Sequence, residues 1–123
     1  MLDPNFFILY VDSPAASAAF YADLLGHTPI QASPTFALLA LQSGVKLGLR
    51  SRRAVEPAAT VTGGGTELAF AVDSDATVTS MHAEWARRGL PILQAPVRMN
   101  FGYTFVAADP DGHRLRVVAP SAP

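Results

Sequence analysis

The sequence predicts an α+β fold built from two copies of a βαβββ unit. A strand-like run of aromatic and β-branched residues, Phe6–Val11, is followed at once by a helix signal. The tripeptide Val11-Asp12-Ser13 recurs as Val72-Asp73-Ser74, 61 positions later, and again separates a strand-like run from a helical one. The chain then closes with two strand-like runs joined by Asp109-Pro110-Asp111-Gly112, which indicates a hairpin.

The first helix has clear boundary signals. Ser13 suits the cap position, Pro14 the first helical position, and Gly26 ends the helix. Residues 15–25 continue it, and the expected buried face is formed by Ala19, Phe20 and Leu24. The three strands that complete this unit are expected at residues 30–32, 36–41 and 45–50.

The second half repeats this order, with a strand at 68–72 and a helix at 75–88 closed by Gly89. Between the halves, residues 51–65 show no sustained period and include three consecutive glycines, which predicts a flexible connector. We therefore expect one domain over residues 1–123, with units at 5–50 and 66–119.

The closing hairpin separates two kinds of side chain. A three-residue loop places Val106 opposite Arg116 and Phe105 opposite Val117. One face, suited to burial against a helix, then carries Tyr103, Phe105, Leu115 and Val117. The other carries Thr104, Val106, Arg114, Arg116 and Val118. Because two arginines beside apolar residues are unusual in a plain core, we expect function on this second face.

Composition narrows the class of protein. A chain of 123 residues is long enough to bury one core, and its net charge of -1 argues against a general nucleic-acid binder. The absence of cysteine excludes disulfides and thiolate metal sites. The apolar run at residues 6–11 is too short to span a membrane, so we expect a cytoplasmic protein without a membrane partner.

Two stretches resemble the vicinal oxygen chelate superfamily of glyoxalases, extradiol dioxygenases and bleomycin-resistance proteins. They are YVDSPAASAAFYADLLG at 10–26 and DPDGHRLRVV at 109–118. The resemblance implies mixed β-sheets that curl into a cup with helices on the outer face, and a homodimer. Within the superfamily, two stretches are most similar to metal-free antibiotic-binding members such as a phenazine-resistance protein. They are FGYTFVAADPDGHRLRVV at 101–118 and ELAFAVDS at 67–74 with HAEW at 82–85.

Enzymes of that superfamily hold a divalent metal with His and Glu side chains from four strands. The matching positions here are Phe6, Gly48, Glu67 and Arg116. Phe6 and Gly48 have no side-chain donor, and Arg116 is a cation without a lone pair to give. The resemblance therefore implies that the metal centre is absent, and we expect no cofactor.

The parity of the strand that begins at Glu67 predicts a lined cavity. Ala69 and Ala71 share the face of Glu67 and leave room beside it. The residues expected to line the cup are Phe6, Ile8, Phe36, Gly48, Arg50, Glu67, Phe101, Thr104, Val106 and Arg116. Glu67 and Arg116 are expected to pair, either as a structural ion pair or as a contact to ligand.

These observations predict a protein that binds and sequesters a small aromatic or antibiotic-like molecule and confers drug resistance. The alternative is a glyoxalase-like or dioxygenase-like enzyme that uses the same cup without metal or with an atypical site. In that enzyme Glu67 would act as a base and Arg116 would stabilise negative charge. A third class, a structural or partner-binding module, lacks a supporting hydrophobic stripe in the sequence.

Overall fold

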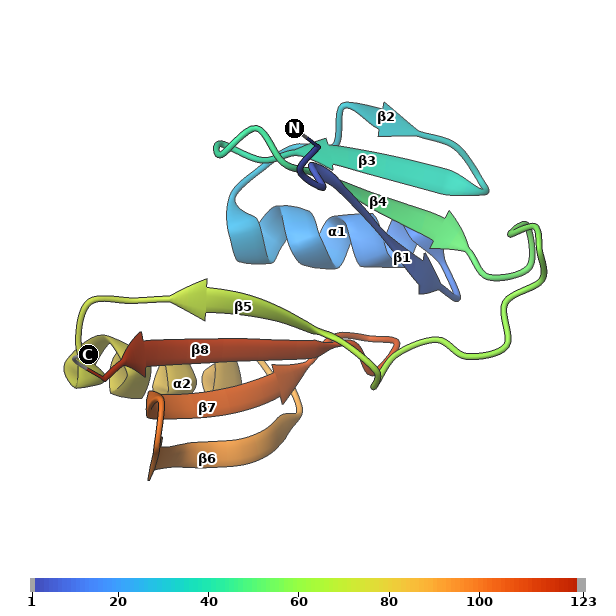
Figure 1. The fold of residues 1–123 in the computed structure, drawn as a ribbon. Coiled ribbons are helices and arrows are strands. Elements are labelled where there is room, and N and C mark those ends of the chain that lie inside the picture. Colours follow the sequence, from blue (N-terminus) through green and yellow to red (C-terminus); the bar gives the residue numbers. More distant parts are fainter. Residues whose placement is uncertain (1, 122–123) are drawn as a thin grey trace. The chain divides into compact units, whose positions relative to one another are not determined.

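The computed structural model describes residues 2–121, and the chain divides into two units, the first ending at Gly63 and the second beginning at Gly64 (Figure 1). Each unit contains one helix and one four-stranded mixed sheet in the order strand, helix, three strands. Neither sheet is closed, because each leaves two edge strands. The predicted α+β class and its two βαβββ units are confirmed.

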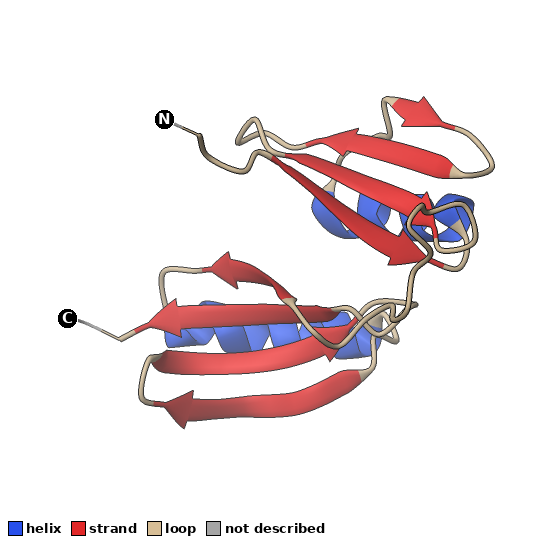
Figure 2. Ribbon diagram, turned by 45° about the vertical axis from the view of Figure 1, so that its right-hand side comes forward, coloured by secondary structure: helices blue, strands red, loops and turns tan. Residues whose placement is uncertain are grey.

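In the first unit the helix α1 covers one face of the sheet and leaves the other face open (Figures 1 and 2). Its elements are β1 (Phe6–Val11), α1 (Pro14–Leu25), β2 (Gln31–Ala32), β3 (Phe36–Ala40) and β4 (Lys46–Ser51). The strand order is β1-β4-β3-β2, with β1 parallel to β4 and the other pairs antiparallel. Strand alternation therefore sends Leu9, Val11, Leu47 and Leu49 into the core beneath the helix.

The predicted limits of α1 are confirmed, but its predicted buried face is wrong. The Oγ of Ser13 accepts a hydrogen bond from the Ala16 N–H at 3.1 Å, and Gly26 ends the helix with φ 73°. The helix buries Pro14, Ser17, Ala18 and Tyr21 instead of Ala19, Phe20 and Leu24. The sequence PAASAAFYADLL is apolar nearly all round, so its periodicity does not single out one face.

In the second unit the helix α2 likewise covers one face of its sheet (Figures 1 and 2). Its elements are β5 (Glu67–Ala71), α2 (Asp75–Arg87), β6 (Ile92–Met99), β7 (Gly102–Ala108) and β8 (Arg114–Pro120). The strand order is β5-β8-β7-β6, with β5 parallel to β8. Trp85 of α2 packs edge-on against Phe70 and Phe105, with ring centroids 5.7 and 5.4 Å away.

The β7–β8 hairpin has the predicted register. Phe105 lies opposite Val117 and Val106 opposite Arg116, as a three-residue loop requires. Within the turn, the buried Asp109 accepts two backbone hydrogen bonds at Oδ1, from Asp111 at 2.9 Å and His113 at 2.8 Å. This carboxylate organises the turn, and its two bonds hold β7 and β8 in register.

The segment between the units differs from the expected connector at its start. Ser51 is the last residue of β4, and Arg53 donates hydrogen bonds back to Asp12. The first residues of the expected connector are therefore tied to the first unit. Within residues 2–121, no helix combines the length and apolar character that crossing a membrane requires.

Candidate functional site

The face of the first sheet that α1 leaves open is rich in aromatic side chains. Phe6, Ile8 and Tyr10 alternate along β1 with the buried Leu9 and Val11, and Phe6 and Ile8 are 43% and 47% exposed. We call this surface the aromatic face and define it by Phe6, Ile8, Tyr10, Phe36, Gly48 and Arg50. It contains all five of the predicted site residues that belong to the first unit.

Gly48 lies between the two phenylalanine rings of the aromatic face. A Cβ atom at this position would lie 2.9 Å from a ring carbon of Phe6 and 2.9 Å from one of Phe36. Since real Cβ atoms do not approach carbon so closely, only glycine lets both rings lie across β4 in this way. The sequence therefore places two aromatic rings against the position where enzymes of the predicted superfamily have a metal ligand.

Arg50 continues this surface at the end of β4. Its Cζ atom lies 4.4 Å from the centroid of the Phe36 ring, which is a cation–π contact, and the residue is half-buried. A pocket of about 330 Å³ is lined by Ile8, Tyr10, Arg50, Ala54, Val55 and Glu56.

Four residues of that pocket, Tyr10, Ala54, Val55 and Glu56, were not predicted from the sequence. Tyr10 could have been found, because it shares its strand parity with Phe6 and Ile8. Ala54, Val55 and Glu56 lie in the segment after β4, where no periodic pattern indicates the direction of a side chain.

In the second unit, three polar side chains and one aromatic ring lie together on the face opposite α2. We call them the arginine cluster and define it by Glu67, Phe101, Thr104 and Arg116. Arg116 donates hydrogen bonds from Nε to Glu67 Oε1 at 2.8 Å and from Nη2 to Oε2 at 3.0 Å. Its Nη1 donates to Thr104 Oγ1 at 3.1 Å, and this hydroxyl donates to the Val117 carbonyl at 2.7 Å. The predicted pairing of Glu67 with Arg116 is confirmed.

The arginine cluster is partly withdrawn from solvent. The side chain of Arg116 is 17% exposed and that of Glu67 is 34% exposed. The hydrogen bond from Arg116 lowers the pKa of Glu67 against the opposing effect of desolvation, and the positive charges of Arg116 and Arg114 lower this pKa further. Glu67 is therefore held as a carboxylate and is a weak proton acceptor.

The remaining predicted site residues of the second unit differ in their exposure to solvent. Phe101 is 48% exposed, and its ring centroid lies 5.5 Å from the Arg116 Cζ. Thr104 and Val106 are buried. The accessible members of the cluster are thus Phe101, Glu67 and Arg116, while Thr104 acts by holding the guanidinium.

The residues at the four metal-ligand positions do not fit a divalent ion. Phe6 and Gly48 carry no donor, and both carboxylate oxygens of Glu67 already accept hydrogen bonds from Arg116. Residues 2–121 contain no cluster of three or more His, Asp or Glu side chains arranged to hold a metal. A hard or borderline cation needs several converging oxygen or nitrogen ligands, and this set offers one engaged carboxylate.

The profile of the glyoxalase/bleomycin resistance protein/dioxygenase superfamily matches residues 4–117. The chain belongs to this superfamily. A relative of the chain, the phenazine antibiotic resistance protein EhpR of Enterobacter agglomerans, is 26% identical over 127 residues, which cover 94% of this chain and 91% of EhpR.

Two solved structures have the same fold as this chain. An Agrobacterium tumefaciens protein solved by NMR in solution is 57% identical, with a TM-score of 0.91 and coverage of 99% of this chain and 100% of that one. A glyoxalase-related enzyme from Fulvimarina pelagi is 22% identical, with a TM-score of 0.82 and coverage of 97% and 88%. At that identity, the second likeness concerns the fold alone.

Proposed function

We propose that this superfamily member binds a planar aromatic compound of antibiotic type and sequesters it without altering it, which confers drug resistance. The observation that carries the proposal is the packing of the Phe6 and Phe36 rings over Gly48, each with a ring carbon 2.9 Å from where a Cβ would stand. A flat ligand gains offset-stacking contacts on such a surface, worth about 0.5–1.5 kcal/mol per ring pair beyond the area buried.

Arg116, in the second unit, supports a separate part of the proposal, which is a contact to a polar group of a ligand. A guanidinium has five N–H donors, and the hydrogen bonds to Glu67 and Thr104 use three of them. The remaining donors can bind a carboxylate or carbonyl oxygen of a ligand, with the guanidinium already fixed in orientation. The similarity to a phenazine antibiotic resistance protein supports a fused aromatic ring system as the class of ligand.

The same geometry favours binding over turnover. The lowered pKa of Glu67 makes it a poor general base, because a base is most effective when its pKa lies near the working pH. The four metal-ligand positions offer no donor set, so we propose that the protein works without a resident metal or cofactor. Elemental analysis after dialysis should find no stoichiometric zinc, nickel, iron or manganese; about one metal per chain would support the enzyme instead.

Calorimetric titration with phenazine-1-carboxylate as the probe tests the proposal. We expect saturable binding, and we expect chromatography with mass detection to recover the probe unchanged. Phe6→Leu should weaken binding, whereas Phe7→Leu is the matched control, because Phe7 is equally exposed but lies on the other face of β1. Equal affinities in the two variants would remove the aromatic face from the proposal, and a converted probe would favour the enzyme.

We also propose that the protein is a cytoplasmic homodimer that takes no nucleic acid or membrane as a partner. The internal repeat and the long segment between the units support the dimer, because related units can exchange partners between chains. Light scattering should give the mass of two chains at micromolar concentration, and a single-chain mass would count against the dimer.

A further inference from the structure

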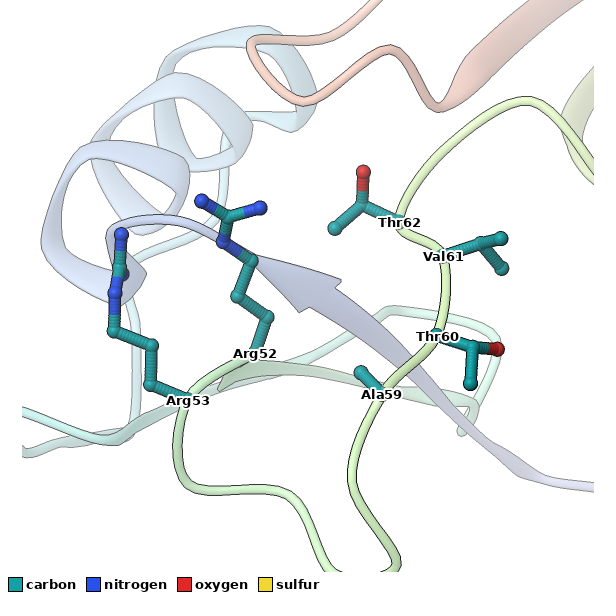
Figure 3. Close-up of a pocket in the computed structure, with 6 residues that line it drawn as sticks. All are labelled: Arg52, Arg53, Ala59, Thr60, Val61 and Thr62. Atoms are coloured by element: carbon teal, nitrogen blue, oxygen red, sulfur yellow. The ribbon is translucent and has the colours of Figure 1, made fainter.

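The first unit contains a second pocket, formed by residues other than those of the aromatic face. It has a volume of about 430 Å³ and is lined by Arg52, Arg53, Ala59, Thr60, Val61 and Thr62 (Figure 3). A volume of this size lies within the range of small-molecule sites, about 300–1,000 Å³. The pocket opens in the segment that follows β4, and all of its lining residues belong to the first unit.

Arg53 forms the fixed wall of this pocket. Its Nη1 donates to the main-chain carbonyl of Asp12 at 3.1 Å, and its Nη2 donates to Asp12 Oδ1 at 2.5 Å. The hydrogen bond and charge of Arg53 lower the pKa of Asp12, which therefore stays ionised and keeps the arginine in place. The guanidinium of Arg53 is therefore engaged in contacts with Asp12.

Arg52 is placed differently. Its backbone N–H donates to the Val11 carbonyl at 2.9 Å, which anchors the residue at the end of β1. Its Nη2 lies 3.7 Å from Asp12 Oδ1, close enough for charge attraction but too far for a hydrogen bond. Among the residues that the structure describes, the Arg52 guanidinium has no hydrogen-bond acceptor, so its fork of donors is available.

The opposite wall of the pocket is formed by Ala59, Thr60, Val61 and Thr62. Figure 3 shows Arg52 extending between Arg53 and the segment 59–62, with its guanidinium on the side of Thr62. Thr62 is half-buried. Two arginines against one aspartate leave a net positive charge of about one at the pocket, which favours an anion.

We propose that this pocket binds an oxyanion, a carboxylate or a phosphate group, held by the fork of Arg52 and the hydroxyl of Thr62. The planar guanidinium matches two oxygens of such a group with two parallel hydrogen bonds, which a spherical anion cannot accept in the same way. The site is separate from the proposed aromatic ligand and does not depend on it.

The test uses the full chain, labelled with ¹⁵N, and follows amide shifts at residues 52–53 and 59–62. Inorganic phosphate and acetate are titrated separately, each against sodium chloride at the same ionic strength. We expect saturable shifts in this segment with at least one of the two oxyanions, and the arm that saturates identifies the group. Equal shifts with chloride, or no saturation in either arm, would overturn the proposal.

Variants of Arg52 distinguish the contribution of its hydrogen-bond donors from that of its positive charge. Arg52→Met should lower the affinity for the oxyanion that saturates by a factor of at least about ten, because this is the scale of a hydrogen bond to a charged group. Arg52→Lys should weaken it less, and Arg87→Met is the matched control, because it removes an exposed arginine of α2 that pairs with Glu84. Thr62→Val tests the hydroxyl in a chain with its arginines intact. Unchanged affinity in both Arg52→Met and Thr62→Val would refute the site.

Discussion

Arg116 donates two parallel hydrogen bonds to Glu67, from Nε to Oε1 at 2.8 Å and from Nη2 to Oε2 at 3.0 Å. The two residues come from the parallel pair β5 and β8 and are 49 positions apart in sequence. A fork-to-fork pair of this kind fixes the plane of the guanidinium as well as its position. Whatever Arg116 binds is therefore bound in a set orientation.

Replacing Arg116 tests whether this orientation serves a ligand. Arg116→Met keeps most of the length and packing but removes the donors, so it should weaken a bound phenazine carboxylate by about 1.5–3 kcal/mol. Glu67→Gln should weaken it less, because it only loosens the arginine. Calorimetric titration measures both, and Arg87→Met is the matched control, because it removes an exposed arginine of α2, on the other side of the sheet, that pairs with Glu84.

The structural alternative gives a different pattern. If the ion pair only supports the fold, both variants should lower the melting temperature while affinity per folded molecule stays unchanged. Melting curves recorded beside the titrations separate the two outcomes.

The lowered pKa of Glu67 predicts a dependence of stability on pH. In the unfolded chain the carboxyl titrates near its ordinary value of 4.5, and in the folded chain it titrates lower. The stabilisation is thus complete above the unfolded pKa and is lost as the pH falls through the folded pKa. The free energy of unfolding should fall more steeply in the wild type than in Glu67→Gln as the pH is lowered from about 5 to about 3.

Urea unfolding at several pH values measures this difference. Asp12 and Glu84 also have lowered pKa values through their arginine partners, so both proteins should retain a common acid dependence. Curves for the two proteins that stay parallel over this pH range would contradict the assignment to Glu67.

The position of Gly48 predicts that replacing it weakens ligand binding while the stability of the fold changes little. In Gly48→Ala the new methyl group meets the ends of the Phe6 and Phe36 rings, which can swing away at little cost to the fold. Binding of the aromatic probe should weaken by about 0.5–1.5 kcal/mol, the worth of one stacked ring pair. Gly65→Ala is the control, because a Cβ there meets nothing within 4 Å. Unchanged affinity in Gly48→Ala would show that the flatness of this surface is irrelevant.

The hydrogen bonds of Asp109 within the turn predict that replacing this residue lowers the free energy of unfolding. Asp109→Ala leaves the N–H groups of Asp111 and His113 without their acceptor, and such groups cost about 1–3 kcal/mol when buried. Asp109→Asn retains an oxygen at the same place and should lose much less. Denaturant unfolding measures both, and equal losses would assign the effect to charge instead of to the acceptor.

The parts of the fold that follow from local chemistry were predictable from the sequence. The register of β7 and β8 follows from a turn of known length, and Glu67 and Arg116 were placed on one face by strand parity. The buried face of α1 was not predictable, because the helix's own alanines and leucines are distributed around its whole circumference. The pocket of Arg52 and Thr62 was missed because an aperiodic segment gives no signal for the direction of its side chains.

The turn at Asp109 also has a consequence for the order in which the arginine cluster assembles. Arg116 and Thr104 are 12 positions apart and meet across a hairpin that closes over a short loop, whereas Glu67 must arrive from 49 positions away. Chain entropy makes the second closure costlier and slower than the first. Amides of β7 and β8 should therefore gain protection before those of β5 in pulse-labelled refolding. Arg116 then meets its hydroxyl partner while its carboxylate partner is still unfolded, so the cluster is completed from the C-terminal end of the chain backward.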